Sequence, residues 1–302
     1  MHMHILIAGG SGFLGSYLIK SLVQAQHSIT LLSRHPERVD APTGVKVVYW
    51  DGDNVQLPPQ DKPIDAVINL CGLSIARYWS KSAKQAIRDS RIKPSQALVK
   101  WLCQLEKKPE LMLQISGIDY YDMPSEQCSE TDKNGDHFLA QLSKDWEATV
   151  QPLKSTSMRV IIARLAPVLA ASHPPLQPLL LATKCCAGAI IGDGKQYFSW
   201  IHHSDFTNII GNMLMHSSYQ GIYNLCAPNP VPYSTLMQAL AKACNRPLWL
   251  RVPAWSLTNT LGEMATLVVD SRKVFPKRLL DAKTSFQFPT IEAAMDNLCQ
   301  SK

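Results

Sequence analysis

A glycine-rich turn between an apolar run and a helical pattern constrains the fold of this chain more than any other feature. Residues 5–15 read Ile-Leu-Ile-Ala-Gly-Gly-Ser-Gly-Phe-Leu-Gly, and apolar residues then recur at helical spacing. In such a segment Gly9 permits the tight turn, Gly12 lets a pyrophosphate approach the backbone, and Gly15 lets the helix pack on the strand. The first N–H groups of a helix lack partners within it and attract phosphate. The segment therefore predicts a dinucleotide site rather than a plain strand–turn–helix. The residues expected to contact the ligand are Gly9, Gly12, Phe13, Leu14 and Gly15.

The end of the second predicted strand indicates which dinucleotide is bound. The β-type run His27–Ser33 is followed by Arg34. A site that prefers NAD carries a carboxylate here, about twenty residues beyond the glycines, to bind the ribose 2′-hydroxyl. A serine hydroxyl and a guanidinium instead donate to a 2′-phosphate, which a carboxylate would repel. Ser33 and Arg34 thus predict NADP(H) as the cofactor, the alternative being a solvated arginine at the start of a loop.

Apolar strand-like runs alternate with helical patterns over the first half of the chain. Alternating strands and helices predict an α/β fold with a Rossmann-type, doubly wound parallel sheet and ligands at the carboxyl ends of its strands. We expect residues 1–165 to form the NADP-binding domain. The further predicted strands are 45–49, 66–70, 111–116 and 160–164, and the predicted helices are 81–106 and 137–153.

The pattern changes beyond residue 165. Residues 170–178 are rich in proline and small side chains, which favours a linker or lid over another regular unit. We expect residues 166–302 to form a smaller C-terminal α/β lobe that holds the substrate. Within it, residues 204–226 contain a strand pattern at 223–225 that is a candidate to return to the nucleotide-binding sheet. The predicted helices of this part are 205–216, 233–244, 255–266 and 291–299.

Composition restricts the partners. The net charge of +6 in this chain of 302 residues is spread over single and paired Lys and Arg residues, without a basic block, which argues against nucleic-acid binding. No apolar stretch reaches the roughly 20 residues that a membrane span needs, so we expect a cytoplasmic protein without a membrane partner. The eight cysteines lack metal-site spacing, so no metal is predicted. The oligomeric state is not predicted.

Ten short segments together resemble the extended short-chain dehydrogenases/reductases, and within them the atypical "epimerase family" of sugar-nucleotide epimerase-like proteins. The resemblance covers nearly the whole chain and implies NADP binding. It also identifies residues 249–299 as a region specific to that family. The segments are 9–15, 65–72, 145–147, 164–169, 192–197, 200–202, 223–228, 251–254, 261–264 and 275–279.

Two strand ends in these segments are expected to line the cofactor. After the fourth strand, Cys71 and Gly72 form a small turn that can lie against the adenine–ribose half of the cofactor, unless it is a simple strand-end turn. Pro167 would fix a backbone kink that walls the nicotinamide pocket. Arg164, just before it, fits a buried structural charge paired with an acidic neighbour.

The catalytic pair of the extended reductases is absent. Those enzymes use Tyr-x-x-x-Lys on the helix after the fifth strand, where the lysine lowers the pKa of the tyrosine. Aligned through Asp145-Trp146-Glu147, the pair becomes Ser143 and Glu147 here. The atypical family shares this departure. A serine and a glutamate cannot replace a phenolate beside an ammonium, so standard epimerase chemistry is not expected.

Polar residues after the fifth strand are the remaining candidates for proton transfer. Ile118 stands near the place where the family usually has a serine, so the usual hydroxyl is lost. Ser116 and Tyr120 are the candidate catalytic residues, and Asp119 could orient the tyrosine. The alternative is a loop whose tyrosines only pack. The candidate substrate-pocket residues are Tyr121, Trp200 and His202, although a Trp-Ile-His run at a strand edge is more often packing.

These features lead to one hypothesis and one alternative. The hypothesis is an NADP(H)-binding oxidoreductase or epimerase-like enzyme acting on a small polar carbonyl or alcohol compound, nucleotide-linked compounds included. Hydride chemistry belongs to the cofactor, so the protein has to supply binding, orientation and one proton-transfer group. The alternative is a non-catalytic NADPH-binding sensor or regulatory module, which the missing Tyr/Lys pair favours.

Overall fold

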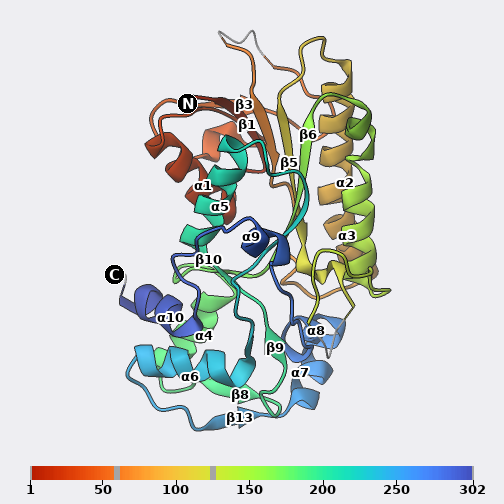
Figure 1. Ribbon diagram of the computed structural model, residues 1–302. Helices are drawn as coiled ribbons and strands as arrows, with labels where there is room; N and C mark the ends of the chain where they lie inside the picture. The colour runs from red at the N-terminus through yellow and green to blue at the C-terminus, as the bar shows by residue number, and fades with distance from the viewer. Residues whose placement is uncertain (1, 58–61, 123–126, 301–302) are drawn as a thin grey trace.

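The computed structural model describes residues 2–57, 62–122 and 127–300. Its centre is a seven-stranded parallel sheet in the order β3-β2-β1-β4-β5-β6-β11 (Figure 1). This confirms the predicted Rossmann-type sheet. The strands are β1 (His4–Ala8), β2 (Ser28–Ser33), β3 (Val45–Tyr49), β4 (Ala66–Asn69), β5 (Leu111–Gly117), β6 (Arg159–Leu165) and β11 (Gly221–Leu225).

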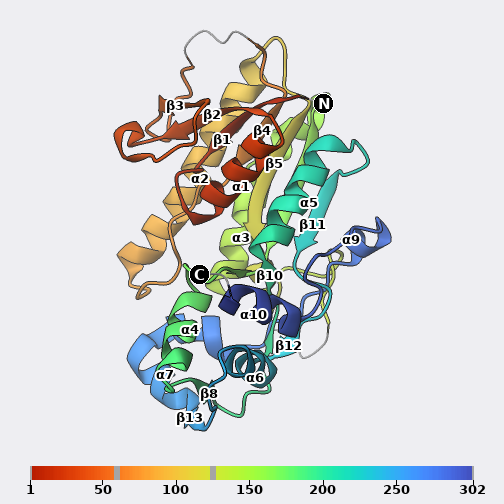
Figure 2. The ribbon, with the colours of Figure 1, turned by 90° about the vertical axis from the view of Figure 1, so that its left-hand side faces the viewer.

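Helices cover both faces of the sheet. The helices α1 (Phe13–Gln24) and α5 (His203–Met215) lie on one face, and α2 (Lys81–Gln104) and α3 (Phe138–Ala148) lie on the other (Figures 1 and 2). Because successive side chains of a strand point to opposite faces, Ile5 joins the core on the α1 side and Leu6 joins the core on the α2 side. Burial on both faces explains why every residue of β1 is buried.

The helix after β5 and the last strand of the sheet differ in extent from the predicted ones. The helix expected over 137–153 ends at Ala148 and is followed by a 3-10 turn, Gln151–Ser155. A proline at 152 has no N–H to donate to the Ala148 carbonyl, and its ring would clash with that carbonyl in a continued helix. The strand expected at 223–225 extends over Gly221–Leu225. It pairs in parallel with β6, so a segment beyond residue 165 completes the sheet.

The C-terminal lobe has a core of its own beneath the carboxyl ends of the strands (Figure 2). The helix expected over 255–266 is broken because Gly262 adopts φ +56°, a conformation that ends a helix. Segment 170–178 does not stay irregular, since α4 begins at Leu176. The lobe contains α4 (Leu176–Lys184), β8 (Ala189–Ile191), β9 (Tyr197–Phe198), β12 (Val231–Pro232), α6 (Tyr233–Ala243), β13 (Leu250–Val252), α7 (Ala254–Leu261), α8 (Thr266–Val269) and α10 (Ile291–Gln300).

Three short elements connect the lobe to the sheet. Strand β7 (Val168–Leu169) pairs with β10 (Ile201–His202), which leads directly into α5, and α9 (Lys277–Asp281) packs beside β11. None of the helices in the described part of the chain is long and apolar enough to cross a membrane.

Candidate functional site

The glycine loop lies at the carboxyl end of β1, beside the turn that follows β4. Gly9 has φ +74°, and a Cβ built on it would lie 2.6 Å from the Cys71 backbone nitrogen. A Cβ on Gly15 would lie 2.1 Å from the Gly10 carbonyl oxygen. The packing of the protein itself therefore requires glycine at both positions, in agreement with the tight turn and the close helix contact that the motif predicts.

Gly12 differs from its neighbours because the fold does not require a glycine there. It is the N-cap of α1 with φ −84° and ψ 178°, which is ordinary extended backbone, and no side chain caps the helix. A Cβ built on Gly12 would meet only the Gly9 carbonyl oxygen, at 3.8 Å. The open space in front of unpartnered helix N–H groups fits a pyrophosphate. The residues present thus fit the dinucleotide that the motif implies.

Arg34 follows the end of β2. Arg34 is exposed and makes no hydrogen bond or ion pair within the described residues. Ser33 is buried, and its Oγ accepts a hydrogen bond from the His35 backbone N–H at 3.1 Å, which leaves its O–H free to donate. Burial raises the pKa of the Cys71 thiol to about 12, and the Arg34 charge acts in the opposite direction on this thiol in the turn after β4.

A buried asparagine that the sequence analysis did not single out fixes the turn after β4. Asn69 Nδ2 donates to Ser95 Oγ at 2.8 Å and to Gln114 Oε1 at 2.9 Å, and Asn69 Oδ1 accepts from the Cys71 backbone N–H at 3.0 Å. The Leu73 N–H is held by Ser90 Oγ of α2 at 2.9 Å. The backbone of the turn is therefore rigidly placed beneath Gly9. An amide at the end of an otherwise apolar strand was the available sequence signal.

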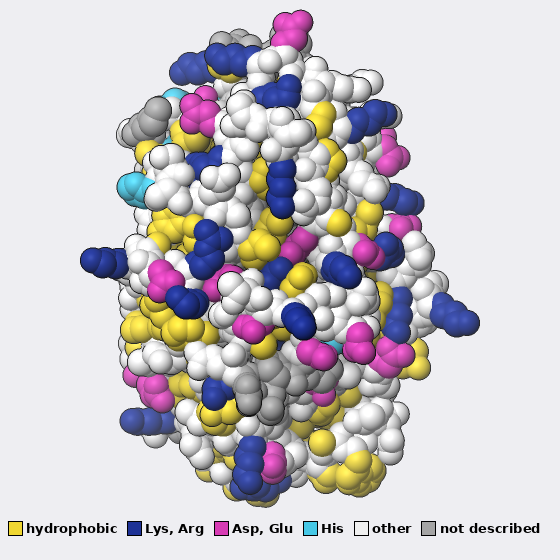
Figure 3. Space-filling model, turned by 45° about the vertical axis from the view of Figure 1, so that its right-hand side comes forward, with side chains coloured by type: hydrophobic (Ala, Val, Ile, Leu, Met, Phe, Trp, Pro, Cys, Tyr) yellow, Lys and Arg dark blue, Asp and Glu magenta, His cyan; other side chains and the backbone are white. Residues whose placement is uncertain are grey.

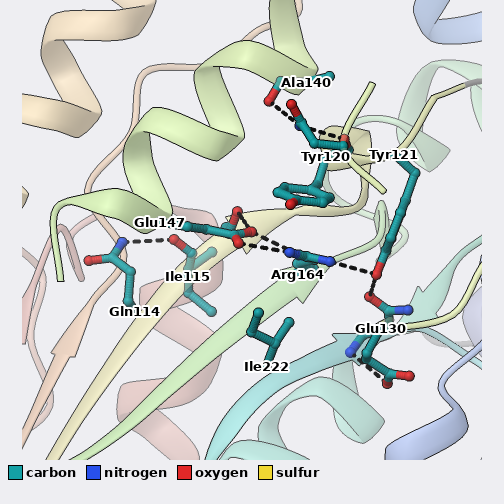
Figure 4. A network of polar contacts seen from close by, with 12 residues as sticks. Gln114, Ile115, Tyr120, Tyr121, Glu130, Ala140, Glu147, Arg164 and Ile222 are labelled. Atoms are coloured by element: carbon teal, nitrogen blue, oxygen red, sulfur yellow. Dashed lines mark hydrogen bonds and ion pairs between the residues drawn. The ribbon is translucent and has the colours of Figure 1, made fainter. Parts of the chain in front are cut away.

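A buried ionic network occupies the region after β5 (Figure 4). Arg164 of β6 pairs with Glu147 of α3 through two hydrogen bonds of 2.8 Å, from Nε to Oε1 and from Nη2 to Oε2. Ser116 Oγ donates to Glu147 Oε1 at 2.8 Å. Arg164 Nη1 donates to the Tyr121 hydroxyl at 2.9 Å, and that hydroxyl donates to Asn224 Oδ1 of β11 at 2.7 Å. The network confirms Arg164 as a buried charge paired with an acidic neighbour.

Two candidate residues are held inside this network. Burial acts to lower the pKa of Arg164, but Glu147 and Tyr121 outweigh it, so the pKa is raised and the guanidinium stays charged. Burial raises the pKa of Tyr121, against the opposing effect of Arg164, so the phenol stays protonated. Ser116 is 2% exposed and donates its proton to Glu147. In this arrangement neither Ser116 nor Tyr121 offers a free group to a substrate.

Tyr120 lies above the same arginine. Its ring centroid is 3.3 Å from the Arg164 Cζ, and Figure 4 shows the ring over the guanidinium. Its hydroxyl makes no hydrogen bond within the described residues, whereas Asp119, which the sequence offered as its orienting group, pairs with Arg272 of the C-terminal lobe at 2.7 Å.

A cavity of about 700 Å³ runs along the α3 side of β6 and β11 and is lined by Tyr120, Glu147 and Ile222, among others. Figure 3 shows hydrophobic side chains near the middle of one face, with Lys and Arg side chains around them and Asp and Glu interspersed. No residue of the glycine loop lines the cavity. This cavity is therefore separate from the dinucleotide loop.

The candidates beyond β6 are mostly packing groups. The Pro167 carbonyl oxygen accepts from the Ile201 N–H at 3.1 Å, at the junction of β7 and β10. Trp200 is fully buried in the core of the C-terminal lobe. His202 is fully buried, its Nδ1 accepts from the Ser204 N–H at the start of α5, and its ring lies 3.9 Å from that of Phe288. Burial lowers the pKa of His202 to about 3, so it is neutral.

Trp200, His202 and Tyr121 therefore do not meet in an open pocket in this structure. One ring of the lobe does reach the nucleotide loop. His173 stacks on Phe13 with ring centroids 4.2 Å apart.

Comparison with known proteins gives two family matches. A model described as the NAD dependent epimerase/dehydratase family matches residues 5–226, and a domain of unknown function, DUF1731, matches residues 252–298. The chain is 31% identical over 297 residues to an epimerase family protein of Staphylococcus saprophyticus, covering 98% of this chain and 99% of that protein.

Solved structures with the same fold extend the comparison. The human epimerase family protein SDR39U1, solved with NADPH, superposes with a TM-score of 0.90 at 27% identity over 99% of this chain and 100% of that chain. A UDP-glucuronic acid 4-epimerase from Bacillus cereus, solved with NAD, gives a TM-score of 0.77 at 16% identity over 98% of this chain and 96% of that chain. At that identity the second likeness concerns the fold alone.

Proposed function

Since the chain belongs to the NAD dependent epimerase/dehydratase family, we propose that it is an NADP(H)-dependent oxidoreductase or epimerase-like enzyme acting on a small polar carbonyl or alcohol compound. The observation that carries the cofactor choice is Arg34, an exposed guanidinium without a hydrogen-bond or ion-pair partner among the described residues, where NAD sites carry a carboxylate. The NADPH present in the human relative supports the same choice.

Each part of the loop region has a binding task in this proposal. The N–H groups at the start of α1 bind the pyrophosphate, and the open space at Gly12 admits it. Arg34 and the free O–H of Ser33 bind the 2′-phosphate. The turn at Cys71 and Gly72, fixed by Asn69, positions the adenine–ribose half. When bound, the cofactor supplies the hydride chemistry, and this chain supplies orientation and a proton.

Tyr120 is the proposed proton-transfer residue. Of the candidates after β5, Ser116 and Tyr121 donate their hydroxyl protons to acceptors within the Arg164 network. The Tyr120 hydroxyl, in contrast, has no hydrogen-bond partner within the described residues.

Tyr120→Phe should lower the rate of NADPH oxidation by about 10²–10⁴-fold, the usual effect of losing a general acid. Ser143→Ala should cost less, because Glu147, and not a lysine, stands four residues after this serine, where the reductases keep their activating lysine. Steady-state NADPH oxidation over a panel of small carbonyl compounds ranks the two variants. If Ser143→Ala is the inactive one, the proton group lies on α3 and the assignment to Tyr120 is wrong.

Arg34→Asp should remove or reverse the preference for NADPH over NADH. The change deletes a charge-assisted contact worth roughly 1.5–3 kcal/mol and puts a carboxylate near the 2′-phosphate. Fluorescence titration of both nucleotides on parent and variant measures the ratio of affinities. Arg38→Asp is the matched control, because Arg38 is exposed and already lies beside Glu37, at 3.5 Å. An unchanged ratio in Arg34→Asp would remove the basis for the cofactor assignment.

A non-catalytic NADPH sensor is the second candidate. The observation that favours it is the Ser116–Glu147–Arg164 network, which places a structural ion pair where related reductases keep a catalytic lysine. A protein that binds NADPH but oxidises it with no carbonyl compound of the panel would fit the sensor.

The proposal extends to partners and location. Acidic and basic side chains alternate on the face in Figure 3, which supports a small-molecule ligand over nucleic acid. A cytoplasmic location is part of the same proposal.

A further inference from the structure

Arg91 of α2 lies beside the turn after β4, and within the described residues its guanidinium has no carboxylate partner. Its side chain is half-buried, with Cζ 5.2 Å from the Trp146 ring centroid. A Cβ built on Gly72 would lie 3.1 Å from Cζ and 3.2 Å from Nη2. The guanidinium therefore fills the space beside Gly72, at the carboxyl edge of the sheet.

The hydrogen bonds of Arg91 use only one of its three nitrogens. Nη1 donates to the Ile87 carbonyl oxygen at 3.1 Å and to Ser90 Oγ at 3.4 Å, both on its own helix. Nε and Nη2 make no hydrogen bond within the described residues. A half-buried guanidinium with two free donor groups is costly unless an acceptor reaches it.

Among the residues that the structure describes, no carboxylate forms an ion pair with Arg91. The acidic group that influences Arg91 electrostatically is Asp119, and the Asp119 carboxylate forms an ion pair with Arg272 at 2.7 Å. Asp270 interacts electrostatically with both members of that pair. Burial lowers the pKa of Arg91 to about 10, against the opposing effect of Asp119. The described part of the chain therefore leaves the charge of Arg91 without a carboxylate in direct contact.

A second free donor lies near the same edge. Ser143 Oγ would be 3.9 Å from a Cβ built on Gly117 at the end of β5, and it makes no hydrogen bond within the described residues. Asp119 Oδ2 lies 3.8 Å from the same built atom. The ends of β4 and β5 are adjacent in the sheet, so the two free donors lie at neighbouring strand ends.

We propose that Arg91 binds an oxyanion, a phosphate or carboxylate group, of a ligand lying over Gly72 and Gly117, with the Ser143 hydroxyl as a second donor. A planar guanidinium with two free nitrogens matches the two oxygens of such a group. This inference rests on the proposed function for the source of the anion. The anion belongs either to the diphosphate of the cofactor or to an acidic substrate that meets the cofactor at the carboxyl edge of the sheet.

Titration calorimetry on Arg91→Gln separates these sources. If the anion is the cofactor diphosphate, the affinity for NADPH falls about 10- to 100-fold, the range for a hydrogen bond to a charged group. If it belongs to a substrate, NADPH affinity is unchanged and the binding of inorganic phosphate to the NADPH-loaded protein is lost by a similar factor. Ser143→Ala should weaken the affected titration by less than about tenfold.

The control is Arg88→Gln on the same helix, whose guanidinium lies at the surface and pairs with Asp145 at 2.6 Å. It should match the parent in both titrations. Arg91→Lys keeps the charge but not the two-pronged geometry, and it should fall between the parent and Arg91→Gln. If Arg91→Gln does not fold, Arg91→Lys takes its place in both titrations.

An Arg91→Gln protein that binds NADPH and phosphate like the parent would overturn the inference while leaving the proposed function intact. A parent that binds no NADPH would overturn the proposed function instead. In that case the anion site is tested with inorganic phosphate and no NADPH. Weaker phosphate binding by Arg91→Gln than by the parent supports the site, whereas equal binding by both proteins, or binding by neither, overturns it.

Discussion

Replacing Gly12 by valine is expected to abolish dinucleotide binding while the protein stays folded. The backbone of Gly12 is ordinary extended chain, and a Cβ there would meet no protein atom closer than 3.8 Å, so valine is sterically accepted. Valine is a poorer N-cap than glycine, which costs about 1 kcal/mol or less. Its branched side chain would occupy the space through which a pyrophosphate reaches the N–H groups of α1.

Gly15→Val is the contrasting control for this experiment. Its Cβ would lie 2.1 Å from the Gly10 carbonyl oxygen, so this variant should lose stability and binding together. Circular dichroism melting and a fluorescence titration with NADPH distinguish the two cases. A folded Gly12→Val protein that binds NADPH like the parent would mean that the loop is only a turn.

Glu147→Ala should destabilise the protein by about 3–5 kcal/mol, because it leaves the buried Arg164 charge without its carboxylate. Arg164 is 2% exposed and donates two hydrogen bonds of 2.8 Å to Glu147. The hydroxyl of Ser116 loses its acceptor in the same change. Urea denaturation of the parent and the variant gives the difference in the free energy of unfolding.

Asp145→Ala is the matched control on the same helix. Its carboxylate pairs with Arg88, with side chains that are 42% and 41% exposed, so its loss should cost only about 0–1 kcal/mol. The double variant Glu147→Leu/Arg164→Met removes both buried charges and should recover much of the lost stability. If Glu147→Ala costs no more than Asp145→Ala, the network is not the structural element described here.

The features predicted correctly from the sequence are local ones. Residues 5–15 specify strand, turn and helix within a single short segment, and the steric needs of Gly9 and Gly15 follow from the same motif. Parallel strands with both faces buried have few polar residues, which made β1 and β4 recognisable from their apolar runs.

The parts that could not be predicted depend on partners distant in sequence. The roles of Ser116 and Tyr121 are set by Glu147, Arg164 and Asn224, which only the folded sheet brings together. The burial of Trp200 likewise depends on the later helices of the C-terminal lobe. The role of Arg91 could not be predicted from the sequence, because its position beside Gly72 follows from the packing of α2 on the sheet. The helix break at Gly262 could have been predicted from the glycine itself.

The claim that this chain binds NADP(H) at the loop after β1 is tested most directly by calorimetric titration of the unmodified protein with NADPH and NADH. We expect saturable binding of one NADPH per chain, at least about tenfold tighter than NADH, because the Arg34 contact requires a 2′-phosphate. Equal affinities for the two nucleotides, or no saturable binding of either, would contradict it.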